Sequence, residues 1–271
     1  MDYLPIIHTI TGPLPGPRIA VIAGVHGDEP VGVKALEKIL PNLVLERGTL
    51  VAVIANPKAL VANKRFLEAN LNRSLIPNPP ENTLEGKIAP ILMQILDTVV
   101  AALDIHAGMG GEPPFVICEE NSFPIAERMP VSIVSTGWVT AEPGSTDEYM
   151  FRQGKPALCI ECGNKWDFEA MTPVAETAIW QFLNYFQMIK PISPTTEHQR
   201  FIGVHYSVFK KTADFSFTRK YKGFDVLQPG ELIATDGIER YVAPAYPSCI
   251  IFPWAEAPVG TEAFIIAENF N

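Results

Sequence analysis

The stretch Arg18 to Pro30 reads R-I-A-V-I-A-G-V-H-G-D-E-P, and it decides how the beginning of this chain folds. After Arg18 the first residues are apolar and rich in β-branched side chains, as in a buried parallel strand. Pro30 suits the first turn of a helix, and apolar residues follow it at helical spacing up to Leu40. A buried strand that leads directly into an amphipathic helix is typical of an α/β sheet.

His26 and Glu29 stand three positions apart in the turn between that strand and that helix. An imidazole and a carboxylate are two of the three protein ligands of a His₂Glu catalytic zinc site. On this fragment alone, a helix-capping glutamate beside an incidental loop histidine is an equally good interpretation.

Two further apolar runs end in side chains of the same kinds. Val99 to Ile105 (V-V-A-A-L-D-I) is followed by His106, and Lys155 to Ile160 (K-P-A-L-C-I) is followed by Glu161. In open α/β sheets, ligands bind beyond the carboxyl ends of the strands, so these two side chains and His26 are expected to converge. The chain has only five histidines, and two of them stand at such positions. This favours a shared metal site.

Length, composition and net charge limit the classes of protein to which this chain can belong. A chain of 271 residues can bury one large core, or one large and one small core, and 47% hydrophobic with 19% charged residues is ordinary for a globular protein. A formal net charge of -9 argues against nucleic acid or an anionic membrane surface as a partner. The first residues do not read as a signal peptide, and no apolar run reaches the roughly 20 residues that span a bilayer. We therefore expect a cytoplasmic protein.

The four cysteines do not form the pattern of a disulfide framework in a chain of this length. Cys159 and Cys162 match C-x-x-C, but on a strand these two thiols would point to opposite faces. Cys118 and Cys249 stand alone. Buried, inert thiols are the preferred interpretation over a redox motif or a Cys₄ zinc site.

Strand and helix patterns alternate up to about residue 190, which predicts a sheet with helices on both faces. We expect strands at 18–25, 49–55, 99–105, 114–118, 131–135 and 155–161, and helices at 29–40, 83–97 (strained or broken at Pro90), 146–152 and 172–190, the last with Thr172 as its cap and Pro173 in its first turn. Residues 191–199 read as a polar, proline-marked linker. Short alternating runs then follow, and Asp236-Gly237 is a strong hairpin signal. The predicted domains are 1–192 (α/β, catalytic) and 200–271 (small, β-rich).

Asn63 to Leu75 (N-K-R-F-L-E-A-N-L-N-R-S-L) is polar and cationic within an acidic protein. The segment lacks helical periodicity, so we expect a loop after the second strand. A solvated charged loop is one interpretation. An anion-binding loop is equally favoured, because Arg65 and Arg73 suit a carboxylate-bearing substrate.

Four motifs taken together resemble a known family. They are G-V-H-G-D-E at 24–29, N-L-N-R at 70–73, D-I-H at 104–106 and I-E-C-G at 160–163. Their order and spacing resemble the succinylglutamate desuccinylase/aspartoacylase family, a branch of the zinc carboxypeptidase superfamily. The resemblance implies a zinc-carboxypeptidase-like α/β fold: a mixed, mostly parallel sheet with helices on both faces, plus a small C-terminal β domain that narrows access to the site.

The resemblance also implies roles for individual residues. One zinc ion per chain would be bound by His26, Glu29 and His106, with Glu161 as general base and acid and Arg65 polarising the scissile carbonyl. Asn72 and Arg73 would hold the substrate carboxylate, and Arg152 would be a further substrate contact. The chain departs from the family in two places. Asp104 to Gly108 reads D-I-H-A-G where aspartoacylases have D-L-H-N-T. The family's C-terminal substrate-binding tyrosine has only Tyr241 and Tyr246 as candidates.

The first functional hypothesis is therefore a zinc-dependent amidohydrolase that acts on carbon–nitrogen bonds other than peptide bonds. Its substrate would be a small N-acylated amino acid or a related amine. The alternative is a metallocarboxypeptidase that acts on short peptides, since the same motifs serve both reactions. A catalytically inactive binding protein on the same scaffold is a third hypothesis. Glu161 as a fourth ligand of a closed structural site is disfavoured, because structural zinc prefers cysteine. The motifs indicate no oligomeric state.

Overall fold

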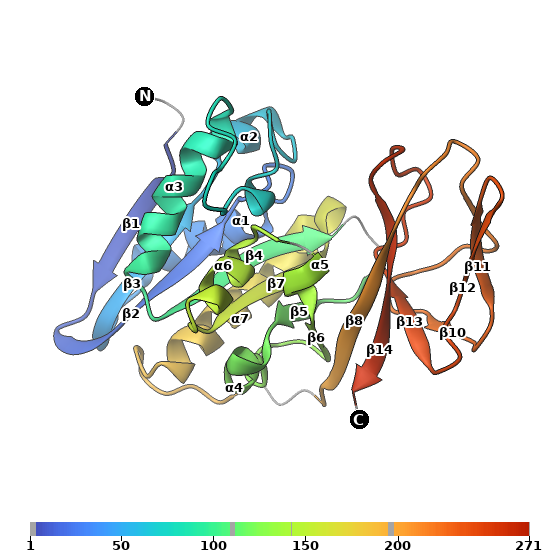
Figure 1. Cartoon of the computed structure of the whole chain (residues 1–271). Helices are drawn as coiled ribbons and strands as arrows, with labels where there is room; N and C mark the ends of the chain where they lie inside the picture. Colours follow the sequence, from blue (N-terminus) through green and yellow to red (C-terminus); the bar gives the residue numbers. More distant parts are fainter. Residues whose placement is uncertain (1–3, 109–111, 142, 195–197, 271) are drawn as a thin grey trace.

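The computed structural model describes residues 4–108, 112–141, 143–194 and 198–270 (Figure 1). In this part of the chain an 11-stranded sheet has the order β1-β3-β2-β4-β7-β5-β6-β8-β14-β13-β10, and a 3-stranded sheet has the order β12-β11-β9. The strands are β1 (Ile6–Thr11), β2 (Leu14–Ala23), β3 (Arg47–Ile54), β4 (Ala101–Gly108), β5 (Phe115–Cys118), β6 (Ile133–Thr136), β7 (Ala157–Asn164), β8 (Arg200–Phe209), β9 (Ser216–Phe217), β10 (Val226–Leu227), β11 (Leu232–Asp236), β12 (Glu239–Val242), β13 (Ser248–Ile251) and β14 (Glu262–Phe270).

Helices connect most of the strands in the first two thirds of the chain. The α-helices are α1 (Val31–Ile39), α2 (Pro57–Ala62), α3 (Leu84–Asp97), α4 (Phe123–Ala126), α5 (Trp138–Ala141), α6 (Thr146–Arg152) and α7 (Phe168–Tyr185). Short 3₁₀ helices are η1 (Leu40–Asn42), η2 (Leu71–Arg73), η3 (Glu120–Ser122) and η4 (Lys165–Asp167). None of the helices described is long and apolar enough to cross a membrane.

The centre of the large sheet is parallel. Strand β2 pairs in parallel with β3 and β4, and β4 pairs in parallel with β7. Antiparallel pairs lie at β1–β3 and β5–β7, while the strands beyond β8 are all antiparallel. The predicted fold class is thereby confirmed: a mixed, mostly parallel sheet with helices, followed by an antiparallel β region.

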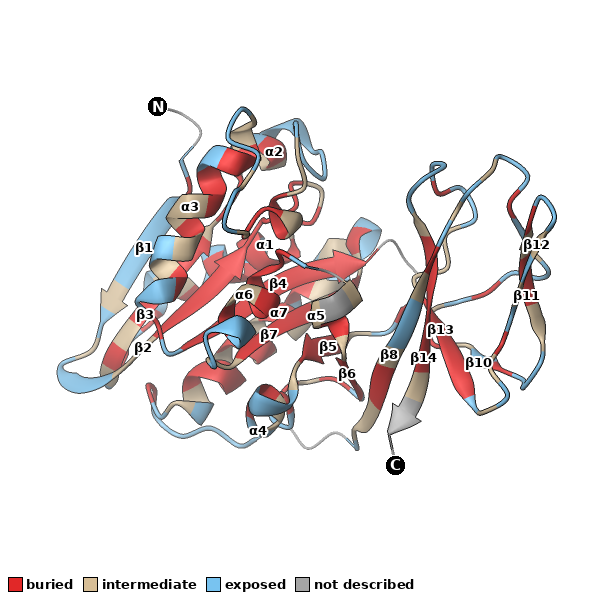
Figure 2. Cartoon of the chain, viewed as in Figure 1, coloured by how far each residue is buried: buried red, intermediate tan, exposed pale blue. Residues whose placement is uncertain are grey.

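Strand β2 shows how the sheet is covered on both faces. Side chains alternate along a strand, so Ile19 and Val21 point to one face and Ala20 and Ile22 to the other. The first pair packs in one buried cluster with residues of α1 and α7, and the second pair packs in another with residues of α3. Figure 2 shows the resulting band of buried strands between exposed outer surfaces. The two layers keep the carboxyl ends of β2, β4 and β7 in fixed relative positions.

The C-terminal β region has its own buried cluster, which includes Phe215, Ile233 and Phe264. A further cluster joins it to the α/β part through Phe115 on one side and Ile265 on the other. The hairpin predicted at Asp236-Gly237 is confirmed, since β11 pairs antiparallel with β12. Strands from both predicted domains share the large sheet, and the domain boundary itself stays a prediction. Residues 195–197 of the predicted linker lie outside the described residues.

One strand was missed, and two helices differ from their predictions. Strand β1 was not expected, although it pairs along its whole length with β3. Helix α3 runs through Pro90 without a break, because its apolar face, including Ile88 and Leu92, is fully buried. Helix α7 begins at Phe168 and ends at Tyr185, so Pro173 lies inside it instead of in its first turn. In both helices, tertiary packing outweighs the unfavourable effect of an internal proline.

Cys118, Cys159, Cys162 and Cys249 are all buried, and none of them forms a disulfide. Burial raises the pKa of Cys118 and Cys162 well above the ordinary thiol value, and it raises the pKa of Cys249 to about 11. These thiols stay protonated at neutral pH and are poor nucleophiles and poor metal ligands. The prediction of inert cysteines is in keeping with this chemistry.

Candidate active site

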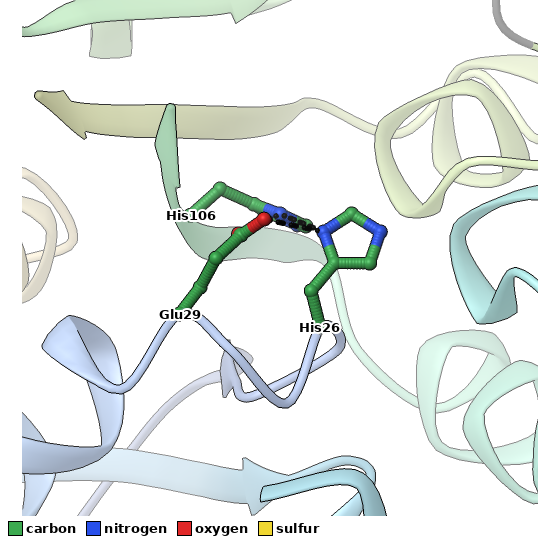
Figure 3. A group of neighbouring side chains, drawn as sticks. All are labelled: His26, Glu29 and His106. Atoms are coloured by element: carbon green, nitrogen blue, oxygen red, sulfur yellow. Dashed lines mark hydrogen bonds and ion pairs between the residues drawn. The ribbon is translucent and has the colours of Figure 1, made fainter. Parts of the chain in front are cut away.

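Three buried side chains meet at the carboxyl ends of β2 and β4. Figure 3 shows His26, Glu29 and His106 pointing toward one another. His26 Nδ1 lies 2.9 Å from Glu29 Oε1, His106 Nδ1 lies 3.0 Å from Glu29 Oε2, and the two Nδ1 atoms are 3.2 Å apart. Among the residues described, this is the one group of three or more histidine, cysteine or acidic side chains that could hold a metal ion.

The second nitrogen of each imidazole also has an oxygen neighbour. His26 Nε2–H donates to Asn70 Oδ1 at 3.1 Å, and His106 Nε2 lies 3.0 Å from Asp104 Oδ2. Contacts of this kind fix the ring and its tautomer in metal sites, so that the other nitrogen faces the ion. The Asn70 contact therefore turns His26 Nδ1 toward Glu29, and the charge of Asp104 lies beside His106 Nε2.

The pKa values of these three side chains depend on their burial and on the charged groups close to them. Burial and the charge of Arg65 lower the pKa of His26, although Glu29 acts in the opposite direction. Burial alone would raise the pKa of Glu29, but the charge of His26 and hydrogen bonds from both imidazoles hold it well below the ordinary value. Burial would lower the pKa of His106, but Asp104 raises it well above the ordinary value. Glu29 is thus an ionised carboxylate, which is the form that binds a metal.

Backbone geometry explains why the ligands converge. The turn from β2 to α1 comes very close to α2: a β-carbon at Gly27 would lie 2.0 Å from the carbonyl carbon of Ala59. Only glycine can occupy position 27, between His26 and Glu29, because any side chain there would clash with α2. His106 comes from the neighbouring strand β4, where Asp104 stands two positions earlier and so lies on the same face.

Glu161 lies on β7 directly beside His106, because the two residues are partners in the parallel pair β4–β7. It is half-buried and lines the same cavity as the three clustered side chains. The structure therefore brings His26, Glu29, His106 and Glu161 into one place.

The cationic loop after α2 reaches this group through Arg65. Its Nη1–H donates to Glu29 Oε1 at 2.8 Å, while the Arg65 side chain is 42% exposed and Glu29 only 3%. A guanidinium with one edge on the buried carboxylate and the other edge in the cavity can meet a negatively charged or polarised group of a substrate. The backbone also ties the loop to the turn, since Gly27 N–H donates to the Arg65 carbonyl at 3.2 Å.

A buried carboxylate holds the loop in place. Glu85, in the first turn of α3, is 0% exposed and accepts N–H groups at 2.8, 3.2 and 3.1 Å from the backbone of Leu67, Glu68 and Ala69. It also accepts from Asn56 Nδ2 at 3.2 Å. Burial would raise the pKa of Glu85, but these hydrogen bonds lower it below the ordinary value. The loop that presents Arg65 is therefore folded around an ionised glutamate.

Asn72 and Arg73 belong to η2, and both line the cavity. Asn72 Oδ1 accepts from the backbone N–H of Thr146 at 3.3 Å, which links η2 to the start of α6. Arg73 Nη1–H donates to the Asn72 carbonyl at 2.6 Å. The structure thus places Asn70, Asn72 and Arg73 of the N-L-N-R motif in the same cavity as His26, Glu29 and His106, which together are called the metal-type group below.

The described residues that line the cavity do not include Arg152, Tyr241 or Tyr246. Arg152 is the last residue of α6, and its half-exposed side chain forms an ion pair with Glu148 of the same helix. Tyr241 OH donates to Glu239 at 3.1 Å in the β11–β12 hairpin. Arg152 as a substrate contact stays a prediction, as do Tyr241 and Tyr246 as candidates for the family's substrate-binding tyrosine.

The cavity has a volume of about 810 Å³ and lies between the α/β part and the C-terminal β region. From the C-terminal region it is lined by Phe252, Pro253, Trp254, Glu256, Pro258, Thr261 and Glu262. Phe252 adopts a left-handed backbone with φ 51°, and its ring packs on Phe115 and Trp138 at centroid distances of 5.8 and 5.9 Å. A bulky residue in this conformation is a strained position that packing holds in place.

A buried ion pair connects the turn that carries His26 and Glu29 with the end of β7. Lys165 Nζ donates to Asp28 Oδ2, and the two side chains are 4% and 15% exposed. Asp28 stands between His26 and Glu29 in the chain, while Lys165 follows β7, which carries Glu161. The pair therefore helps to hold two elements of the site at a fixed separation.

Sequence reasoning gave no role to Asn70, Asp104, Glu85 or Lys165. For Asp104 a signal exists, because the D-x-H spacing puts both side chains on one face of a strand. Asn70 is part of the N-L-N-R motif, but its contact with His26 is long-range. Glu85 and Lys165 act on segments 16 or more positions away in the sequence, so no local pattern reveals them.

Comparisons with known proteins agree with this architecture. Residues 15–185 match the succinylglutamate desuccinylase/aspartoacylase catalytic domain. A succinylglutamate desuccinylase from Vibrio cholerae serotype O1 is 23% identical over 285 residues, covering 94% of this chain and 81% of the relative. One from Erwinia tasmaniensis is 23% identical over 281 residues, covering 94% of this chain and 85% of the relative.

Solved structures show the same fold. The crystal structure of succinylglutamate desuccinylase from Vibrio cholerae has a TM-score of 0.82 at 19% identity, covering 97% of this chain and 85% of that one. The product-bound ectoine utilization protein EutE (DoeB) from Ruegeria pomeroyi has a TM-score of 0.77 at 19% identity, covering 96% and 88%. The match to the catalytic domain spans well over half of the sequence. This chain belongs to the succinylglutamate desuccinylase/aspartoacylase family.

Proposed function

We propose that this protein is a zinc-dependent hydrolase that cleaves the amide bond of a small N-acylated amino acid or a related amine. One observation carries the proposal. Two imidazoles and a carboxylate converge within 4.8 Å of one another, and Glu161 stands beside them on the adjacent strand. Membership of a family whose named members are desuccinylases supports the same reaction class.

The donor set of His26, Glu29 and His106 fits zinc. Two nitrogens and one ionised carboxylate form the ligand set of catalytic zinc sites, and the second nitrogen of each ring has an oxygen neighbour as such sites require. Zinc bound by these three residues would lower the pKa of a bound water to about 7 and polarise the amide carbonyl. We propose one zinc ion per chain.

Glu161 is the proposed general base and acid. It takes a proton from the attacking water as the new carbon–oxygen bond forms at the amide carbonyl. It then delivers a proton to the amine nitrogen as the carbon–nitrogen bond breaks. Its half-buried position in the cavity supports both tasks, because the side chain reaches the substrate and is still shielded from bulk water.

The cationic loop is proposed to act on two different charges. Arg65, at the edge of the metal-type group, stabilises the negative charge that develops on the carbonyl oxygen. Asn72 and Arg73 hold a carboxylate that the substrate carries in the ground state as well as in the transition state. The second assignment rests on their place in the same cavity.

A hydrolysis screen tests the proposed function. The purified protein is analysed for bound metal and then incubated with N-acetyl, N-succinyl and N-formyl amino acids beside short peptides. We expect release of a free amino acid from at least one N-acylated substrate, at a higher kcat/KM than from any peptide. Preferential release of C-terminal residues from peptides would identify a carboxypeptidase instead. A metal-loaded protein that hydrolyses neither class would identify a binding protein.

A further inference from the structure

One side-chain oxygen links the metal-type group to the N-L-N-R motif. Asn70 Oδ1 accepts the backbone N–H of Asn72 at 3.0 Å, and it lies 3.1 Å from His26 Nε2. The first contact caps η2, since Asn70 directly precedes that helix. The second contact joins residues 44 positions apart in the chain. The same atom therefore contacts a proposed zinc ligand and the segment proposed to bind the substrate carboxylate.

The contact with Asn72 determines how the Asn70 amide is turned. A backbone N–H can only donate, so the Asn70 atom that faces it is the carbonyl oxygen and not the amide nitrogen. This oxygen can only accept, so the His26 Nε2 atom that it meets carries the proton. A neutral imidazole with its proton on Nε2 keeps its lone pair on Nδ1, which is the nitrogen that faces Glu29. The cap of η2 thus sets the tautomer that His26 needs in order to bind a metal.

The short helix η2 is held so that Asn70 and the carboxylate-binding segment move together. The backbone carbonyl of Asn70 accepts the Arg73 N–H at 3.0 Å and the Ser74 hydroxyl at 2.8 Å. Leu71 is fully buried in the apolar cluster that joins β2 and α3. Packing therefore anchors the apolar side of η2, while Asn70 fixes its polar side against the metal-type group. A shift of the Asn70 amide would also shift Asn72 and Arg73.

We propose that Asn70 is a positioning residue that couples zinc binding at His26 to binding of the substrate carboxylate at η2. This inference rests on the proposed function. A His26 ring that is fixed by zinc holds, through its Nε2–H, the Asn70 amide that caps η2. An η2 that is fixed by a bound carboxylate in turn presents the same amide oxygen to His26. The coupling is reciprocal, because both ligands favour the same position of one shared oxygen.

Zinc affinity and KM of Asn70 variants test the coupling. Asn70→Ala loses both contacts and should weaken zinc binding by about 10- to 100-fold in a competition with a chelator. With zinc at saturation, its KM for the N-acyl amino acid found in the hydrolysis screen should rise by about 10-fold, whereas kcat/KM for the matching carboxamide, which lacks the carboxylate, should change by no more than about twofold. Asn70→Asp keeps acceptor oxygens and should restore most of the zinc affinity. Ser74→Ala, the matched control, removes a hydrogen bond of η2 without touching His26 and should bind zinc like wild type.

Asn70→Ser separates coupling from two independent contacts. Its hydroxyl oxygen lies one bond closer to the backbone than Asn70 Oδ1, so it can still cap η2 but falls short of His26. Coupling requires that this variant, too, binds zinc more weakly and has a KM raised by at least about threefold for the carboxylated substrate. Two independent contacts would leave its KM at the wild-type value. The variant also keeps the test open if Asn70→Ala does not fold.

Several results would overturn the proposal. Wild-type zinc affinity in Asn70→Ser would mean that Asn70 only caps η2. Weaker zinc binding with an unchanged KM would mean that it serves His26 alone, and an equal loss on the acid and on its carboxamide would indicate a general loss of structure. These outcomes differ from failure of the proposed function, in which the wild type binds no zinc or hydrolyses no N-acyl amino acid, and both proposals fall together.

Discussion

The metal-type group and the cationic loop share one cavity but are held by different kinds of structure. His26, Glu29 and His106 follow from the register of neighbouring parallel strands and one tight turn. Arg65 lies in irregular backbone that is folded around the buried carboxylate of Glu85. The strand ends fix positions through the core of the protein, whereas the loop depends on a few hydrogen bonds. We therefore expect changes in the first region to abolish chemistry and changes in the second to weaken it.

The largest effect is expected for His26→Ala. Loss of one of three ligands should reduce bound zinc from one per chain to almost none, and it should lower kcat/KM by at least about 10⁴-fold, since metal contributes several kcal/mol to such transition states. Elemental analysis and steady-state kinetics measure both. His8→Ala, an exposed histidine on β1, is the matched control and should keep its metal. Equal metal content in His26→Ala and wild type would refute the site assignment.

Glu161→Gln separates metal binding from catalysis within the same region. The variant should keep its metal and its thermal stability but lose about 10²–10⁴-fold in kcat, the usual contribution of general acid–base catalysis. Metal analysis of the variant is the decisive control. If Glu161→Gln loses its metal, Glu161 is a ligand, and the mechanism proposed for it is wrong.

The two arginines of the loop should differ in the kinetic constant that changes. Arg65→Ala should lower kcat by about 10²–10³-fold, because it removes a donor to charge that develops in the reaction. Arg73→Ala should mainly raise KM by about 10- to 150-fold, which corresponds to roughly 1.5–3 kcal/mol for a charge-assisted contact. Steady-state kinetics on an N-acyl amino acid provides the measurement.

Lys64→Ala is the control for both arginine variants, since Lys64 is an exposed cation of the same loop. It should change neither constant by more than about twofold. The assignment of Arg73 to a substrate carboxylate fails if Arg73→Ala works as well as wild type, or if wild type prefers the matching amine that lacks the carboxylate.

The smallest activity effect is expected for Glu85→Gln, which tests how the loop is held. The amide side chain of this variant cannot accept all the N–H groups that Glu85 accepts, so the free energy of unfolding should fall by about 2–3 kcal/mol. The value of kcat should fall by about 10-fold, because Arg65 is displaced. The pKa of Glu85 is lowered in the folded state, so its contribution to stability is present above the ordinary glutamate value. That contribution is lost as pH falls through the lowered folded value.

Denaturant unfolding at several pH values measures this effect. The difference between wild type and Glu85→Gln should be largest near neutral pH and should vanish in acid. Glu81→Gln, an exposed glutamate just before α3, should behave like wild type throughout. A constant difference at every pH would show that hydrogen bonds of the neutral side chain, and not the ionised carboxylate, hold the loop.

The same contrast explains what the sequence could predict. Apolar runs that end in His106 and Glu161 are local patterns, and parallel pairing brings strand ends together, so the four central residues of the site were predictable. The start of α7 was not predictable, because Pro173 is tolerated inside a well-packed helix. Glu85 and Lys165 contact segments distant in sequence. Phe252 joins the cavity only because the C-terminal β region packs on Phe115, and no motif marks that contact.

Removal and return of the metal tests the central claim most directly. An N-acyl amino acid found in the hydrolysis screen is incubated with the purified protein, with the protein after exhaustive chelation, and with the chelated protein after addition of one equivalent of zinc per chain. We predict that chelation abolishes hydrolysis and that zinc restores it, with magnesium as the inactive control because it prefers oxygen ligands. Undiminished hydrolysis by the metal-free protein would contradict the account.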